Sequence, residues 1–147
     1  MKTREAYNIF RNMNMSSEAS VRKTSKILRI LGQPIRILIL HAIGNGEACV
    51  CHLKKLLKKR QAFISQHLMA MREAGILETR RDGRYVFYRV KDLHVFDLIG
   101  FASSMAGLQE GSIVLAVREE RVPGCECPQC TPEGSPQAIN VEGSSLI

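Results

Sequence analysis

Two amphipathic segments followed by a β-hairpin are the feature that most constrains the fold of this chain. Residues 48–57 and 61–73 each place apolar side chains on one face of a helix, and the basic turn Lys58–Arg60 separates them. After Gly75 come two runs of strand composition joined at Asp82-Gly83, a dipeptide typical of tight hairpins. A helix-turn-helix followed by such a hairpin predicts a winged helix, whose second helix enters the major groove of DNA.

The rest of the chain fits a mainly α-helical protein with a β-hairpin wing. Helices are expected over 17–31, 35–43 and about 92–109, and the hairpin strands over 76–80 and 85–90. The last helix has more apolar surface than one small domain needs to bury, and its small residues would let another helix approach closely.

Charge is distributed unevenly along the 147 residues. Residues 1–109 carry a net charge of +11, whereas residues 110–147 carry −4. A basic body with an acidic tail indicates a polyanionic partner for the body. No stretch approaches the roughly 18 apolar residues of a membrane span, and the N-terminus lacks the apolar run of a signal peptide. We therefore expect a cytoplasmic protein without a membrane partner.

All five cysteines fall into two short clusters, Cys49-Val50-Cys51 and the run Cys125-Glu126-Cys127-Pro128-Gln129-Cys130. In a reducing compartment, clustered cysteines indicate metal or redox chemistry more often than a disulfide framework. Thiolates bind soft metals and metalloids. A chain that combines such clusters with a DNA-binding unit is best explained as a switch, in which an ion captured by sulfur changes the affinity for DNA.

Five short motifs follow one another along the chain: Gly32-Gln33-Pro34-Ile35-Arg36-Ile37-Leu38, Ala48-Cys49-Val50-Cys51-His52-Leu53, Ser65-Gln66-His67-Leu68, Ala74-Gly75-Ile76-Leu77 and Asp82-Gly83-Arg84. In this order they resemble the ArsR/SmtB family, over roughly residues 17–105. Members of that family are winged-helix homodimeric repressors of bacteria and archaea that release DNA when they bind a metal or metalloid. The resemblance implies a homodimer formed through the terminal helices, with double-stranded operator DNA as its partner. No catalytic constellation is assembled, so neither an enzymatic activity nor a small organic substrate is expected.

The expected organisation has four parts. Residues 1–16 form a polar N-terminal arm, and residues 17–110 form the winged helix-turn-helix domain for DNA binding and dimerisation. For residues 111–121 the sequence leaves open whether they extend the last helix. Residues 122–147 are a proline- and glycine-rich tail, expected to be flexible except where its cysteines are anchored.

The chain departs from the ion-binding patterns of the family. Arsenic-responsive members open the third helix with C-x-C-x-x-C; here Cys49 and Cys51 match the first two positions, but Lys54 occupies the third. Cadmium- and lead-sensing relatives add cysteines from an N-terminal arm, and residues 1–48 contain none.

The zinc site of other relatives, on the last helix, is matched only in its first half. Asp92 and His94 fit the Asp-x-His pattern, whereas Met105 and Leu108 stand where the second pair would fall. That site is therefore expected to be lost, with Asp92 acting as a helix cap beside a surface histidine.

The missing thiolates are expected from the tail, and two arrangements remain open. The tail could hold the ion alone through Cys125, Cys127 and Cys130, or two of these could join Cys49 and Cys51 in a four-sulfur site. As(III) and Sb(III), which three sulfurs satisfy, are favoured over Cd(II), Pb(II), Zn(II) and Hg(II).

Two further expectations concern the third helix. His52 is expected to face solvent rather than to serve as an additional ligand. If Cys49 and Cys51 both lie on this helix, their side chains point about 200° apart, and one ion can bind both only by unwinding the first turn. Such unwinding would re-space the recognition helices of a dimer and lower its affinity for DNA.

The residues expected to contact DNA lie in the second helix, the basic turn and the hairpin. Base contacts are expected from the N-terminal half of the recognition helix, namely Gln61, Ala62, Ser65, Gln66 and His67. Contacts to phosphate or the minor groove are expected from Lys58, Lys59, Arg60, Arg81 and Arg84.

Two alternative functions fit the same residues. The cysteines could make the DNA-binding protein a sensor of oxidants or reactive sulfur, through thiolate oxidation or persulfide formation. Alternatively, the chain could buffer or deliver metal while its basic body docks an acidic partner. Weakening of DNA binding by soft ions would favour the metal-responsive repressor, and weakening by oxidant or polysulfide but by none of the ions would favour the redox sensor. Failure to bind any DNA fragment at low salt would leave metal buffering or delivery.

Overall fold

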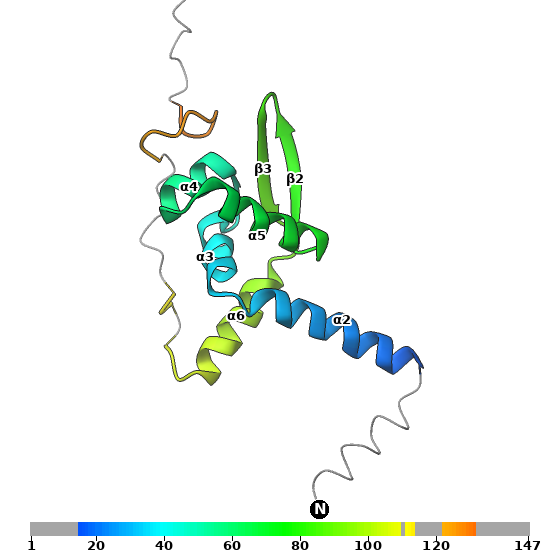
Figure 1. Ribbon diagram of the computed structural model, residues 1–147. Helices are drawn as coiled ribbons and strands as arrows, with labels where there is room; N and C mark the ends of the chain where they lie inside the picture. The colour runs from blue at the N-terminus through cyan, green and yellow to red at the C-terminus, as the bar shows by residue number, and fades with distance from the viewer. Residues whose placement is uncertain (1–14, 110, 114–121, 132–147) are drawn as a thin grey trace, which may run out of the picture.

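Helices and a small sheet alternate along the part of the chain that the computed structural model describes, residues 15–109, 111–113 and 122–131. In chain order the elements are α2 (Met15–Leu31), α3 (Pro34–Ile43), β1 (Glu47–Cys49), α4 (Val50–Leu57), α5 (Gln61–Glu73), β2 (Leu77–Asp82), β3 (Tyr85–Val90) and α6 (His94–Met105). This order, with the hairpin β2–β3 standing beside α4 and α5, is that of a winged helix (Figure 1). The predicted fold class is confirmed.

Local signals explain where the central helices begin and end. Pro34 occupies the first turn of α3, where its missing N–H would have no intrahelical partner, and Gly44 ends that helix with a φ of 57°. Lys58 ends α4 in the left-handed conformation, with a φ of 51°. These sharp ends give the short turns that allow α3, α4 and α5 to pack around one core.

The core lies where the three central helices meet the base of the sheet. Ile39 and Leu40 of α3, Leu53 of α4, and Ile64 and Leu68 of α5 are fully buried there. Removing such a side chain from water contributes about 1.5–3 kcal/mol. The helical spacing of apolar residues that predicted these helices is thus the spacing that fills the core.

A third strand, which the sequence patterns did not predict, completes the sheet. β1 pairs antiparallel with β3, so that the strand order is β1-β3-β2 and Cys49 lies opposite Phe87. The expectation that Ala48 and Cys49 belong to the third helix is wrong, because both are extended, buried and paired with β3.

The terminal helices lie away from the hairpin tip, at the other end of the domain (Figure 1). α6 ends at Met105, before the predicted residue 109, and residues 111–113 are not helical. Residues 1–14 and 114–121, to which the arm and most of the proposed helix extension were assigned, lie outside the described residues. No helix in the described ranges is long and apolar enough to cross a membrane.

Candidate metal centre and nucleic-acid interface

Residues 122–131, here called the Cys loop, return to the domain and pack against the start of α4 and against β3. The loop buries Cys125, Cys127 and Cys130 in a small apolar cluster with Cys49 and Phe87. In Figure 1 it is the orange segment beside α4 and the hairpin. Residues 52 and 130, separated by 78 positions in the chain, are thereby brought into contact.

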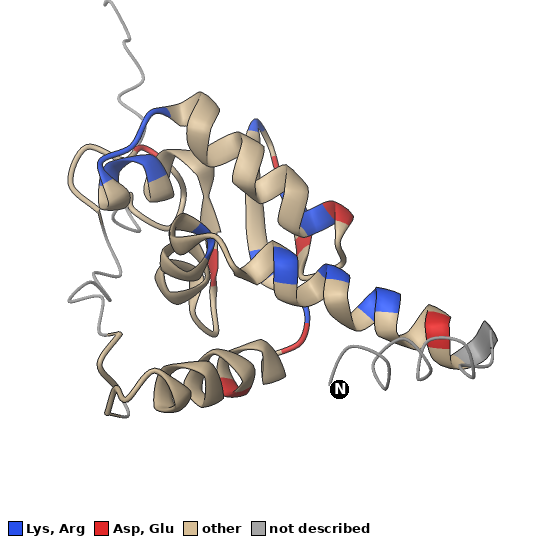
Figure 2. Ribbon diagram, turned by 60° about the horizontal axis from the view of Figure 1, so that its bottom comes forward, with Lys and Arg blue, Asp and Glu red and all other residues tan. Residues whose placement is uncertain are grey.

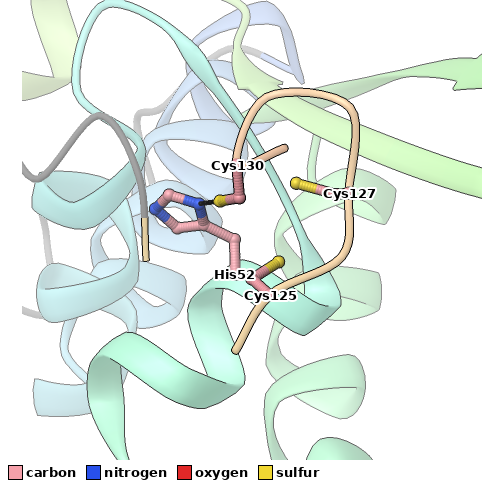
Figure 3. Close-up of side chains that lie close together, drawn as sticks. All are labelled: His52, Cys125, Cys127 and Cys130. Carbon is pink, nitrogen blue, oxygen red and sulfur yellow. Dashed lines mark hydrogen bonds between the residues drawn. The ribbon is translucent and has the colours of Figure 1, made fainter. Parts of the chain in front are cut away.

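Four side chains of this region could hold one metal ion together. Their donor atoms, on His52, Cys125, Cys127 and Cys130, all lie within 4.8 Å of one another, and all four residues are buried. Figure 3 shows the histidine ring of α4 facing the sulfurs of the Cys loop, with His52 Nδ1 3.2 Å from Cys130 Sγ. Three thiols and an imidazole are a donor set that soft and borderline ions such as Zn(II) and Cd(II) accept. We call these four residues the Cys3His set.

The start of α4 fixes the position of His52. Cys49 is the N-cap of this helix, in an extended conformation with φ −86° and ψ 165°, and its sulfur accepts a hydrogen bond from the His52 N–H at 3.4 Å. His52 follows in the first turn and is only 8% exposed. The expectation that His52 faces solvent is therefore wrong. Its burial depends on the docking of the Cys loop, so the local sequence offered only its place directly after Cys51 as a signal.

The two cysteines near α4 also approach the Cys loop. The buried Cys49 thiol lies within hydrogen-bonding reach of Cys125 and Cys127, and the half-buried Cys51 lies within reach of Cys125. Because Cys49 precedes the helix, the premise that both side chains project from helical turns about 200° apart is wrong. The structure places the five sulfurs in one region without unwinding α4.

Burial controls the protonation of the thiols. It raises the pKa of Cys49 to about 11, and burial also raises the pKa values of Cys125 and Cys130. At Cys127 burial acts in the same direction, but hydrogen bonds from the Cys125 thiol and the Cys130 N–H lower the pKa below its ordinary value. Burial lowers the pKa of His52, so its imidazole is neutral and has a lone pair for an ion.

The Cys loop is bonded to the wing through β3. The Tyr85 hydroxyl donates a hydrogen bond to the Glu126 carbonyl at 2.8 Å, and Arg84 Nη2 donates one to the Tyr85 hydroxyl at 2.9 Å. The Arg84 guanidinium also lies 3.9 Å from the Glu126 carboxylate. One of the arginines predicted to contact DNA is therefore joined to the backbone of the cysteine run.

A second connection runs through β1 to the other wing strand. Gln129 Nε2 donates to Glu47 Oε1 at 3.1 Å, and Arg80 Nε of β2 donates to Glu47 Oε2 at 3.1 Å. The bond from Arg80 lowers the pKa of Glu47, so this carboxylate stays ionised. Sequence reasoning found neither Glu47 nor Tyr85, because both acquire their role from a loop that is distant in sequence.

The predicted DNA-contacting residues lie along one basic turn, the start of α5 and the hairpin tip. The turn that precedes α5 consists of lysine and arginine residues, blue in Figure 2. The exposed members of the predicted set are Lys58, Lys59, Arg60, Gln61, Ala62, Gln66, Arg81 and Arg84, and the half-buried members are Ser65 and His67.

The Asp-x-His segment lies at the start of α6, whose first residue is His94. The Asp92 carboxylate accepts a hydrogen bond from the His94 N–H at 3.0 Å and lies 2.7 Å from His94 Nδ1, and both side chains are exposed. The surface histidine is confirmed. The N-cap residue of α6 is Leu93, so Asp92 bonds the first N–H of the helix from one position before the cap.

The sequence of this domain matches a known protein family and known regulators. The family model for bacterial regulatory proteins of the arsR family matches residues 33–79. An HTH-type transcriptional regulator of Methanocaldococcus jannaschii is 38% identical over 78 residues, which cover 52% of this chain and 88% of that protein. The chain belongs to the ArsR family. The resemblance stated from the motifs is confirmed.

Other relatives of this ArsR-family chain are similar over the same domain. The transcriptional repressor SmtB of Mycobacterium tuberculosis is 35% identical over 82 residues, covering 56% of this chain and 61% of its own. The structure of the repressor BigR from Xylella fastidiosa matches with a TM-score of 0.55 and 28% identity, covering 66% of this chain and 100% of that one. NolR from Sinorhizobium fredii matches with a TM-score of 0.58 and 25% identity, over 66% and 97% of the two chains.

Replacing Tyr85 by phenylalanine should loosen the Cys loop. The change keeps the ring but removes the hydrogen bond to Glu126, which is worth about 0.5–1.5 kcal/mol. Open forms of the loop should then become about two- to tenfold more populated. Alkylation of the reduced protein, with Cys127 followed by mass spectrometry, should accelerate by that factor.

Tyr88→Phe is the matched control, because Tyr88 lies on the same strand but in the main core. Its alkylation rate should equal that of the wild type. An unchanged rate in Tyr85→Phe would contradict the role of this bond.

Proposed function

We propose that this ArsR-family chain is a transcriptional repressor that binds operator DNA as a homodimer and releases it when thiolates bind a soft metal or metalloid ion. The observation that carries the proposal is the gathering of the Cys3His set at the junction between the helix-turn-helix and the wing. Its relatives support the class of function: SmtB is a transcriptional repressor, and CadC of Listeria innocua is a cadmium resistance transcriptional regulatory protein.

The proposed DNA contacts divide between backbone and bases. The turn before α5 contacts the phosphate backbone through Lys58, Lys59 and Arg60. The wing arginines contact an adjacent phosphate or the minor groove. Gln61 and Gln66, both exposed on α5, can pair with base edges. Backbone contacts supply salt-dependent affinity, whereas contacts from α5 supply sequence preference.

The proposed homodimer forms through the terminal helices. Val21 and Leu28 of α2 and Phe101 and Met105 of α6 expose large apolar side chains, the last with 90% of its surface accessible. A solution structure of the same fold, from Mycobacterium bovis, is described as homodimeric. A two-fold axis at these helices would present two recognition helices to two half-sites of a symmetric operator.

The proposed switch acts through the position of the Cys loop. An ion held by the Cys3His set would hold its cysteines as thiolates and draw the loop and α4 together. The loop in turn fixes Tyr85 and Arg84 on β3, and through Gln129 and Glu47 it fixes Arg80 on β2. A change in the position of the Cys loop therefore changes the orientation of Arg80 and Arg84 on the wing. A coupling free energy of only about 1–3 kcal/mol would lower DNA affinity about 5- to 150-fold.

Two classes of ion fit the thiols in different ways. As(III) and Sb(III) need only three sulfurs, which Cys125, Cys127 and Cys130 supply. Cd(II) and Zn(II) take four ligands, and the buried His52 supplies the fourth. The position of His52 thus adds support for a divalent four-coordinate ion, beside the trivalent metalloids that the sulfur count favours.

Anaerobic titration of the reduced protein on DNA tests the function. The full chain should bind duplexes selected from a randomised library, and Cd(II) or arsenite should weaken that binding about 5- to 150-fold by fluorescence anisotropy. A variant with serine at all five cysteines should bind DNA but ignore the ions. A wild-type protein that binds no duplex at low salt would contradict the proposal and leave metal buffering or delivery.

A redox function is the second candidate, because the Cys127 thiol is surrounded by other thiols and has a lowered pKa. It predicts that hydrogen peroxide or polysulfide, and none of the ions, weakens DNA binding by the wild type. The same titration with oxidant in place of ion decides between the two.

Ion affinity should rise with pH. Within the Cys3His set, burial raises the pKa values of Cys125 and Cys130, so both thiols are protonated near neutrality and must lose protons when an ion binds. The apparent affinity for Cd(II) should rise by up to about tenfold per pH unit for each proton released, between pH about 6 and about 8. His52 does not add to this pH dependence of the Cd(II) affinity, because its pKa is lowered and its imidazole is already neutral. Calorimetric titration in buffers of different ionisation enthalpy counts the protons; a pH-independent affinity would contradict the thiol ligands.

A further inference from the structure

A large apolar side chain stands on the surface that α5 would present to DNA. Phe63 is 41% exposed, although it directly precedes the fully buried Ile64. It lies in the first turn of α5, immediately after the basic turn Lys58–Arg60. Phe63 was not among the residues predicted to contact DNA.

Contacts from α3 hold this ring in place. Phe63 packs edge-to-face on His67, with ring centroids 4.6 Å apart and an interplanar angle of 78°. Arg36 Nε donates a hydrogen bond to His67 Nδ1 at 3.2 Å, and Arg36 Nη1 donates another to the Ile30 carbonyl at 2.9 Å. The chain Arg36–His67–Phe63 thus fixes an exposed aromatic ring from the protein side, which lowers the entropy that the ring would lose on binding.

The chemistry of the major groove leaves one feature for such a ring to recognise. Base edges there present hydrogen-bond donors and acceptors, and thymine alone adds an apolar group, its C5 methyl. The positive charge of the adjacent turn favours a polyanion over a protein surface as the occupant of this face. We propose that Phe63 is a specificity-determining residue that packs on the C5 methyl of a thymine in each half-site. This inference rests on the proposed DNA binding and adds a residue that sets the preferred sequence.

The proposal can be tested by removing the methyl group from the DNA. Duplexes selected from a randomised library by the full-length protein are resynthesised with single dT→dU replacements, which delete the methyl and keep base pairing. Burial of one methyl predicts that, at one thymine in each half-site, affinity of the wild type falls about fourfold. Phe63→Ala should bind the unmodified duplex more weakly and should not distinguish dT from dU at that position.

Two matched variants keep the test decisive. Met69→Ala removes another exposed apolar side chain of α5, 47% accessible, and should retain the full dT/dU ratio. Phe63→Leu keeps an apolar contact and should retain part of the ratio, with circular dichroism showing that each variant is folded. Strong DNA binding without any dT/dU discrimination by the wild type would overturn the role of Phe63 and leave the proposed function standing. A protein that binds no DNA overturns both.

Discussion

The antiparallel pairing of β1 with β3 is the interaction on which the rest of the arrangement depends. It places Cys49 opposite Phe87 at the residue that caps α4. Because the backbone hydrogen bonds of a strand pair fix its register, the Cys49 sulfur, the first turn of α4 and the base of the wing keep a fixed relation. The Cys loop docks on the surface that these three form, and its cysteines meet His52 there.

In the proposed function, base reading and ion sensing would use different connections in this domain. The Arg36–His67–Phe63 contacts join α3 to the first turns of α5, whereas Tyr85 and Glu47 connect the Cys loop to the wing. Under this proposal, an ion would change contacts to the DNA backbone without rebuilding the face of α5 proposed to contact bases. Backbone contacts dominate affinity and carry no sequence information directly. The proposed switch at the wing would therefore change operator occupancy and keep the choice of operator.

The winged helix could be predicted from sequence because its signals are local. Ile64 and Leu68 recur at helical spacing, and Asp82-Gly83 marks the hairpin within a few residues of its strands. β1 could not, since three residues carry too little periodicity and pair with a strand about 40 positions away. The roles of His52 and Tyr85 depend on contacts with the Cys loop, which no local pattern encodes.

The central claim is that donors from α4 and the Cys loop form one metal centre. It is tested most directly by X-ray absorption spectroscopy of the reduced protein with one equivalent of Cd(II). We expect a first shell of sulfur with one nitrogen, the donor types of the Cys3His set. His52→Ala should lose the nitrogen, and serine at positions 125, 127 and 130 should remove most of the sulfur. A shell of oxygen and nitrogen in the wild type, or a sulfur shell unchanged by the three serines, would contradict it.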